Sequence, residues 1–114
     1  MARYMFIVRY ASDGAKGVVK AGGTARRAAI DTMATQLGGH LETFDFAFGE
    51  DDVYSIVELP DNKAAAAYAL AVNSTGLANV RTVVLVTPEE IDAAAQQKVN
   101  YSPPSREWER RYNA

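Results

Sequence analysis

Alternating and apolar runs along the chain predict four β-strands. Residues 3–10 are rich in aromatic and β-branched types, which favour strands. Residues 40–48 alternate, so side chains with even numbers are expected on one face and those with odd numbers on the other. Residues 53–59 follow the polar turn Gly49–Asp52, which predicts an antiparallel hairpin, and residues 79–87 form the fourth apolar run.

Two helical segments are predicted between the first two strands. A short helical turn is expected over residues 18–20. The adjacent Gly22 and Gly23 are expected to interrupt it, because glycine is a poor helix former. Thr24 is a good N-cap for the next segment, where the apolar residues from 30 to 37 recur with the spacing of one helical face.

Two further helices are predicted from their capping residues. Asp61 can cap an alanine-rich helix over residues 64–72. Thr87 is followed by a proline and then by Glu90, which is a capping-box pattern. This pattern predicts a short helix that ends at about Gln97.

The order of these elements predicts an α+β fold. It is β-α-β-β-α-β followed by a short C-terminal helix, the ferredoxin-like arrangement with a four-stranded antiparallel sheet. Right-handed crossovers would place both main helices on one face of this sheet. Each face of the strands nevertheless carries several large apolar side chains. We therefore expect the open face to pack against another copy of the chain, in a homodimer or a higher homo-oligomer.

Length and composition fit one small globular domain. The chain has 114 residues, 48% of them hydrophobic, and we expect a single domain over residues 1–104 followed by a tail over 105–114. The net charge of −2 gives no basis for nucleic-acid binding. No apolar run approaches the ~18 residues of a membrane span, so no membrane association is expected either.

The sequence contains no cysteine and a single histidine, His40. These counts exclude disulfides, thiolate nucleophiles and iron–sulfur clusters, and they predict neither a metal site nor a cofactor. The N-terminal residues lack the pattern of a signal peptide, so a cytoplasmic location is expected.

Residues near the second helical segment could hold a small anion. Thr24, Arg26 and Arg27 follow two glycines at a helix N-terminus, where backbone amides favour negative charge. Arginine can bind a carboxylate or phosphate bidentately, and Tyr10 could add a hydroxyl donor. The alanine-rich helix over 64–72 could leave room for a ligand between helices and sheet. The alternative is a helix break whose arginines pair with nearby acids.

Candidates for catalysis are fewer. His40 could act as a general base near neutral pH. Asp45 lies within a strand, where a buried carboxylate needs a partner, and Tyr54 could donate a hydroxyl hydrogen bond. The alternatives are an exposed histidine and strand carboxylates that pair with Arg9 and Arg81.

A set of short segments resembles one known family. They are Gly22–Arg27, Leu37–Gly39, Phe46–Gly49, Val57–Asp61, Ala71–Gly76, Arg81–Thr82, Leu85–Glu90 and Tyr101–Pro104. Together they resemble the GYD domain family over residues 3–104. The motif that names the family falls at Gly49–Asp52, where Asp51 stands in the tyrosine position and the nearest aromatic hydroxyl belongs to Tyr54.

The resemblance implies a fold similar to the dimeric α+β barrels. That superfamily includes cofactor-free monooxygenases, haem-handling enzymes, lactone isomerases and regulatory ligand-binding modules, and a fold alone does not choose among them. The leading hypothesis is a protein that binds a small anionic or aromatic organic ligand between the helices and the sheet of a homo-oligomer. The alternatives are a cofactor-independent enzyme of the monooxygenase or isomerase type, and an assembly module without a ligand.

Overall fold

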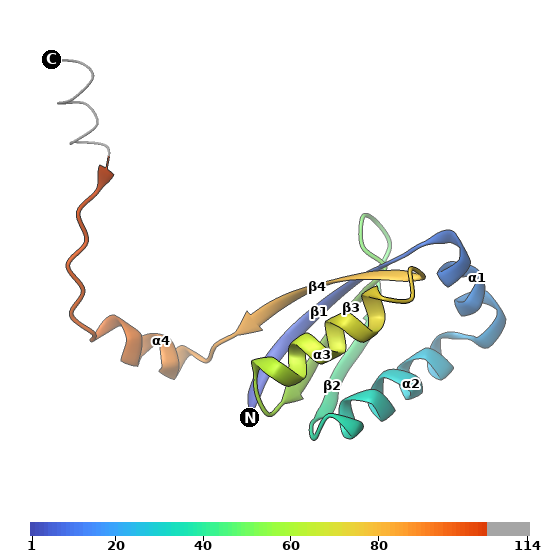
Figure 1. The fold of residues 1–114 in the computed structure, drawn as a ribbon, viewed down its shortest axis with the longest axis horizontal. Helices are drawn as coiled ribbons and strands as arrows, with labels where there is room; N and C mark the ends of the chain where they lie inside the picture. The colour runs from blue at the N-terminus through green and yellow to red at the C-terminus, as the bar shows by residue number, and fades with distance from the viewer. Residues whose placement is uncertain (105–114) are drawn as a thin grey trace, which may run out of the picture.

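The computed structural model describes residues 1–104 and confirms the predicted α+β fold (Figure 1). Its elements are β1 (Ala2–Tyr10), α1 (Ser12–Ala21), α2 (Gly23–Gln36), β2 (His40–Phe46), β3 (Val53–Leu59), α3 (Asn62–Asn73), β4 (Ala78–Leu85) and α4 (Pro88–Ala95). The described strands form one antiparallel sheet in the order β2-β3-β1-β4. This is the ferredoxin-like arrangement. The predicted tail over 105–114 lies outside the described residues.

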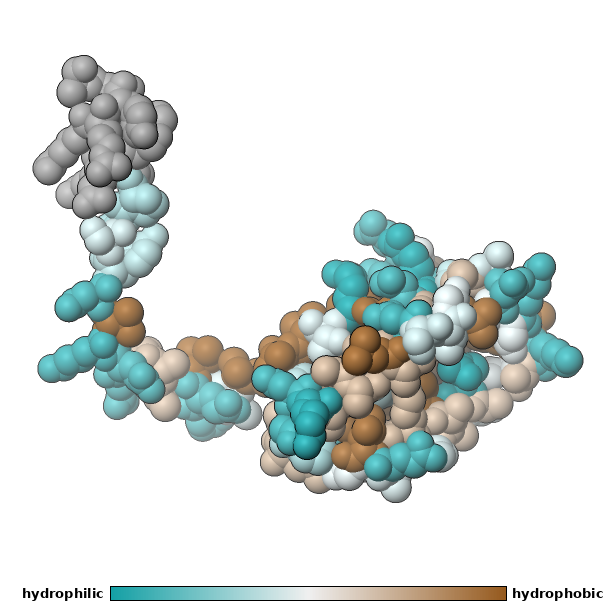
Figure 2. All heavy atoms as spheres, in the orientation of Figure 1, coloured by the Kyte–Doolittle hydropathy of each residue, from teal (hydrophilic) through white to brown (hydrophobic). Residues whose placement is uncertain are grey.

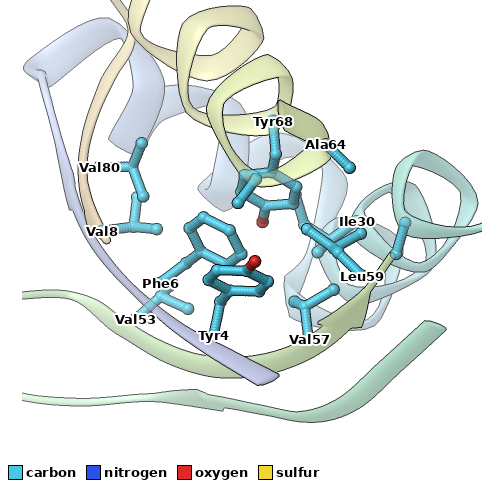
Figure 3. Close-up of a cluster of buried hydrophobic side chains, with 12 residues drawn as sticks. Tyr4, Phe6, Val8, Ile30, Val53, Val57, Leu59, Ala64, Tyr68 and Val80 are labelled. Carbon is cyan, nitrogen blue, oxygen red and sulfur yellow. The ribbon is translucent and has the colours of Figure 1, made fainter. Parts of the chain in front are cut away.

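The core lies between one face of the sheet and helices α2 and α3 (Figure 3). Alternate residues of β1, namely Tyr4, Phe6 and Val8, point into it. Phe6 stacks on Tyr68 of α3 with ring centroids 4.0 Å apart, and Ile30 brings α2 onto the same cluster. Because Phe6 is 0% and Tyr68 1% exposed, this stack fixes α3 on the middle of the sheet.

The opposite face of the sheet is not covered by α1, α2 or α3. We call it the uncovered face. Met5 of β1 lies on it, directly beside Ile56 of β3 and Val83 of β4 in the strand register. Val83 is 41% exposed. The next residue, Val84, lies beside the buried Tyr4 and therefore points to the helix side of the sheet.

Helix α1 is longer than the sequence analysis predicts. Only a turn was expected over residues 18–20, whereas α1 contains ten residues. The glycine pair ends this helix and does not prevent it. Gly22 has a φ of +91°, which favours glycine, and its N–H donates to the carbonyl of Val18. At Gly14, a Cβ would contact the backbone carbonyl of Leu77, so glycine lets α1 lie close to the start of β4.

Strand β2 departs from the predicted alternation. Its register shifts between Leu41 and Thr43, so that Glu42 is an extra residue in the strand. As a result Leu41 and Phe44 both pack against the core, although one has an odd and the other an even number. The strand also ends at Phe46, earlier than predicted. The expected separation of even and odd residues is therefore wrong for this strand.

The predicted N-cap of α2 is wrong: Thr24 lies within the helix, and the N-cap is Gly22, with no side-chain capping hydrogen bond. The predicted N-caps of α3 and α4 are confirmed. The Asp61 carboxylate accepts a hydrogen bond of 2.9 Å from the N–H of Ala64. The Thr87 hydroxyl accepts from the N–H of Glu90, and the Glu90 carboxylate accepts from the N–H of Thr87, both at 3.1 Å. This capping box starts α4, which ends at Ala95, slightly earlier than predicted. Within residues 1–104, no helix combines the length and the apolar character that crossing a membrane requires.

We expect the substitution Gly39→Ala to destabilise the fold strongly. A Cβ at Gly39 would contact the backbone carbonyl oxygen of Glu58, and this backbone is held by the pairing of β2 with β3. The free energy of unfolding should fall by about 3 kcal/mol, the upper part of the range for overpacking. Urea denaturation measures the loss.

Gly17→Ala in α1 is the control for this variant. Nothing lies within 4 Å of the Cβ position at Gly17. Alanine also favours a helix over glycine by ~1 kcal/mol, so this variant should be at least as stable as the parent. Equal losses of stability in the two variants would contradict the close approach at Gly39.

Candidate functional site

A pocket of about 380 Å³ lies among helices α1, α2 and α3 and the strand ends beside them. We call it the helix pocket. Its walls are mainly apolar and include Ile30 and Met33 of α2 and Leu77, which precedes β4. Arg26 and Tyr10 also line it and contribute a guanidinium group and a phenol. Apolar walls with a few placed polar groups are typical of small-molecule binding sites.

Small residues create the volume of the helix pocket. Gly14 and Gly17 of α1 line one wall, and Ala71 of α3 lines another. Because these residues carry little or no side chain, space remains between helices that lie close together. The sequence predicts space beside the alanine-rich helix, but it does not identify α1 as a wall. The sequence did contain a signal for this wall: Gly14 and Gly17 are three residues apart, which places both on one side of a helix.

Arg26 carries the positive charge of the helix pocket. Its side chain is half-buried, and no carboxylate within residues 1–104 lies at ion-pair distance from it. Asp13, which also lines the pocket, pairs with Lys16 at 3.8 Å. Burial raises the pKa of the nearby Tyr68 to about 12, and a hydrogen bond with Ser55 and the charge of Arg26 oppose this rise. A partly desolvated guanidinium of this kind is suited to bind an anion.

Thr24 and Arg27 lie apart from the helix pocket. Both line a separate shallow hollow of about 230 Å³ beside Phe44 of β2. Arg26 and Arg27 diverge because successive residues of an α-helix point about 100° apart. The structure therefore brings Arg26 and Tyr10 to one pocket and places Thr24 and Arg27 at another.

The candidate catalytic residues lie on the uncovered face. The His40 Nε2 atom is 3.3 Å from the carboxylate of Glu58. Asp45 and Tyr54 are cross-strand partners near the other end of β2. His40 is thus not brought together with Asp45 and Tyr54, and the sheet separates all of these residues from the helix pocket. Within residues 1–104, no three histidine or carboxylate side chains are grouped so that they could hold a metal ion.

The polar turn Gly49–Asp52 ties the end of β1 to the hairpin. The Asp52 carboxylate accepts a hydrogen bond of 2.8 Å from the N–H of Tyr10. The N–H of Asp52 donates to the carbonyl of Val8, also at 2.8 Å. Asp52 therefore satisfies two backbone groups at the end of β1. One of them belongs to Tyr10, which lines the helix pocket.

The other acids of this turn pair with strand arginines. Arg9 lies 3.4 Å from Glu50, and Arg81 lies 3.0 Å from Asp51. Arg9 and Arg81 thus pair with acids of the turn, and not with the strand carboxylates that the sequence suggests as partners. These four side chains and Ile7 border a second hollow, of about 500 Å³, on the uncovered face. Its charges already neutralise one another, so it is less suited than the helix pocket to bind an anion.

The sequence profile of the GYD domain family matches residues 4–95, which is most of the chain. The chain belongs to the GYD domain family. This confirms the resemblance seen in the sequence. No curated protein and no solved structure matches the chain. In this GYD-domain protein, the family match includes every residue that lines the helix pocket, as well as the Gly49–Asp52 turn.

We expect Asp52→Ala to destabilise the protein by about 1–3 kcal/mol, because the N–H of Tyr10 loses its acceptor. Glu50→Ala is the matched control, since it removes an exposed carboxylate from the same turn. The surface ion pair of Glu50 with Arg9 is worth ~0–1 kcal/mol. Chemical denaturation measures both variants. A loss at Asp52 no larger than the loss at Glu50 would show that this turn does not hold the end of β1.

Proposed function

We propose that this GYD-domain protein binds a small organic anion in the helix pocket. The observation that carries the proposal is the half-buried Arg26 at the border of a mainly apolar cavity. A carboxylate or phosphate group of the ligand would pair with the guanidinium. The aromatic or aliphatic body of the ligand would then lie against Ile30 and Met33.

The volume of the helix pocket supports a compact ligand. At about 380 Å³ it lies near the lower end of the range for small-molecule sites, which is ~300–1,000 Å³. The guanidinium of Arg26 matches one anionic group, since Asp13, which also lines the pocket, pairs with Lys16. An aromatic or short aliphatic acid fits these features better than a nucleotide or a long-chain lipid. Tyr10, which also lines the pocket, would supply a hydroxyl for a polar substituent on such a ligand.

The proposed functional unit is a homo-oligomer that pairs through the uncovered face. Met5, Ile56 and Val83 form a continuous apolar strip across three strands of this face. Charged pairs flank the strip, among them Arg3 with Glu42 at 2.8 Å. An apolar centre with a polar rim is typical of a protein interface, and a two-fold pairing would cover the strip on both copies.

A second candidate is a cofactor-independent enzyme that uses the pair of His40 and Glu58. A carboxylate that orients an imidazole is one arrangement of a general base. We prefer the binding role because the helix pocket lies on the other side of the sheet from this pair. Asp45 of β2 and its cross-strand partner Tyr54 of β3 also lie at the opposite end of this strand pair from His40, too far to complete a site with it.

Arg26→Ala should abolish or weaken ligand-dependent stabilisation. The test measures the melting temperature with a panel of aromatic and aliphatic carboxylates and phosphates. A ligand at a hundred times its Kd stabilises a protein by about 2.7 kcal/mol. Losing a charge-assisted hydrogen bond of ~1.5–3 kcal/mol should raise that Kd at least ~10-fold.

Arg27→Ala is the matched control, because it removes the same charge from the next position of α2, outside the helix pocket. It should keep the response of the parent protein. An anion that stabilises both variants equally would contradict the role of Arg26. If no anion stabilises the parent protein, the alternative of an assembly module without a ligand is favoured.

Val83→Asp should disrupt self-association, because it places a charge in the centre of the apolar strip. Val84→Asp is the control: it lies one residue further along β4, is 56% exposed and points to the helix side. Sedimentation velocity should give a lower mass for the first variant and an unchanged oligomer for the second. The same oligomer in both variants would contradict pairing through the uncovered face.

A further inference from the structure

The residues that follow β4 form an arm that leaves the body of the protein (Figure 1). We define the arm as residues 86–104. Every side chain from 88 to 104 is exposed. The arm consists of α4 and an extended segment after it. In a chain of this length, a compact fold has a radius of gyration of about 13 Å, whereas the value here is 19.4 Å.

The arm carries apolar side chains in an ordered pattern. Ile91, Ala94 and Ala95 share one side of α4, at helical spacing, and Ile91 is 55% exposed. In the extended segment, Val99 and Tyr101 alternate with polar residues and are 79% and 76% exposed. Figure 2 shows hydrophobic side chains in the open where the chain passes from β4 to α4. Both parts of the arm therefore present one apolar side.

Helix α4 needs a surface to pack on. An isolated helix shorter than ~12–15 residues is marginal in water, and α4 has eight residues. The capping box of Thr87 and Glu90 fixes its start. Further stabilisation has to come from burying the side that carries Ile91, since helices in proteins are held mainly by packing of their apolar side.

The course of the chain directs the arm away from its own uncovered face. Leu85 pairs with Arg3, close to the beginning of β1, so the residues after Leu85 run past the end of the sheet. Thr87 precedes a proline, which favours extended backbone, and its φ of −78° and ψ of 159° are extended. The chain therefore continues in the direction of β4, and the arm extends beyond its own sheet.

We propose that the arm docks on the uncovered face of a second copy of this chain. The inference rests on the proposed self-association and adds a defined contact to it. One chain carries both surfaces: an arm with one apolar side, and an apolar strip over Met5, Ile56 and Val83 that its own arm does not cover. In a two-fold pair, the same contact occurs twice, so each arm covers part of the partner's face.

The absence of cysteine from the sequence allows a direct test in the full-length protein. A benzophenone maleimide is attached to Ile91→Cys, and this chain is co-refolded with unsubstituted chain labelled with ¹⁵N. Illumination links the probe to whatever it contacts, and mass spectrometry separates labelled from unlabelled peptides. We expect links to ¹⁵N-labelled peptides of β1, β3 or β4. The probe on Ala93→Cys, which lies on the polar side of α4, should give several-fold fewer links.

Other results overturn the proposal. Links confined to the probe's own chain would show that the arm folds back on its own body. An oligomer of unchanged mass without links at either position would leave the self-association standing and remove the arm from the contact. A monomer would contradict both the self-association and the docking.

A second pair of variants tests the same contact without a probe. Ile91→Asp places a charge on the apolar side of α4, and Ala93→Asp places it on the polar side. Burial of one large aliphatic side chain corresponds to ~10-fold or more in affinity, so the first variant should raise the dissociation constant of the oligomer by that factor. Equal dissociation constants for the two variants would contradict docking of the apolar side.

Discussion

Helices α2 and α3 pack on one face of this four-stranded sheet, and the rest of the structure depends on this constraint. The stack of Phe6 on Tyr68 fixes which face is covered, because it sets the side of β1 that points to α3. Alternation along the strands then places Met5 and Val83 on the other face. The pairing register of β1 with its neighbouring strands therefore determines both the buried core and the uncovered apolar strip.

The helix pocket exists because residues with small side chains line it. Gly14 and Gly17 in α1 and Ala71 in α3 supply little or no side-chain volume, and the two glycines also lower the helix propensity of α1. The sequence thus gives up local stability where the cavity lies. Arg26 adds a second cost, because a half-buried guanidinium without a carboxylate partner in the described residues is incompletely compensated. Binding of an anion would offset this cost, so the pocket and the charge support the same function.

Two of the three helix caps predicted from local signals form, whereas Thr24 does not cap α2, which begins directly after Gly22. The caps at Asp61 and Thr87 depend on residues three apart, and both form as predicted. The bulge at Glu42 was missed because it depends on the register with β3, which a single strand does not reveal. The separation of Arg26 from Arg27 was missed for a related reason: their sequence positions are adjacent, but the orientation of α2 on the sheet decides which of them faces the pocket.

The central claim is that the chain works as a homo-oligomer with an organic anion in the helix pocket. Native mass spectrometry of gently purified protein tests both parts at once, since it reports the mass of the assembly and of any retained molecule. We predict a multiple of the 12.4 kDa chain mass that carries a discrete additional mass of one small acid per chain. A bare species at the mass of a single chain would contradict the account.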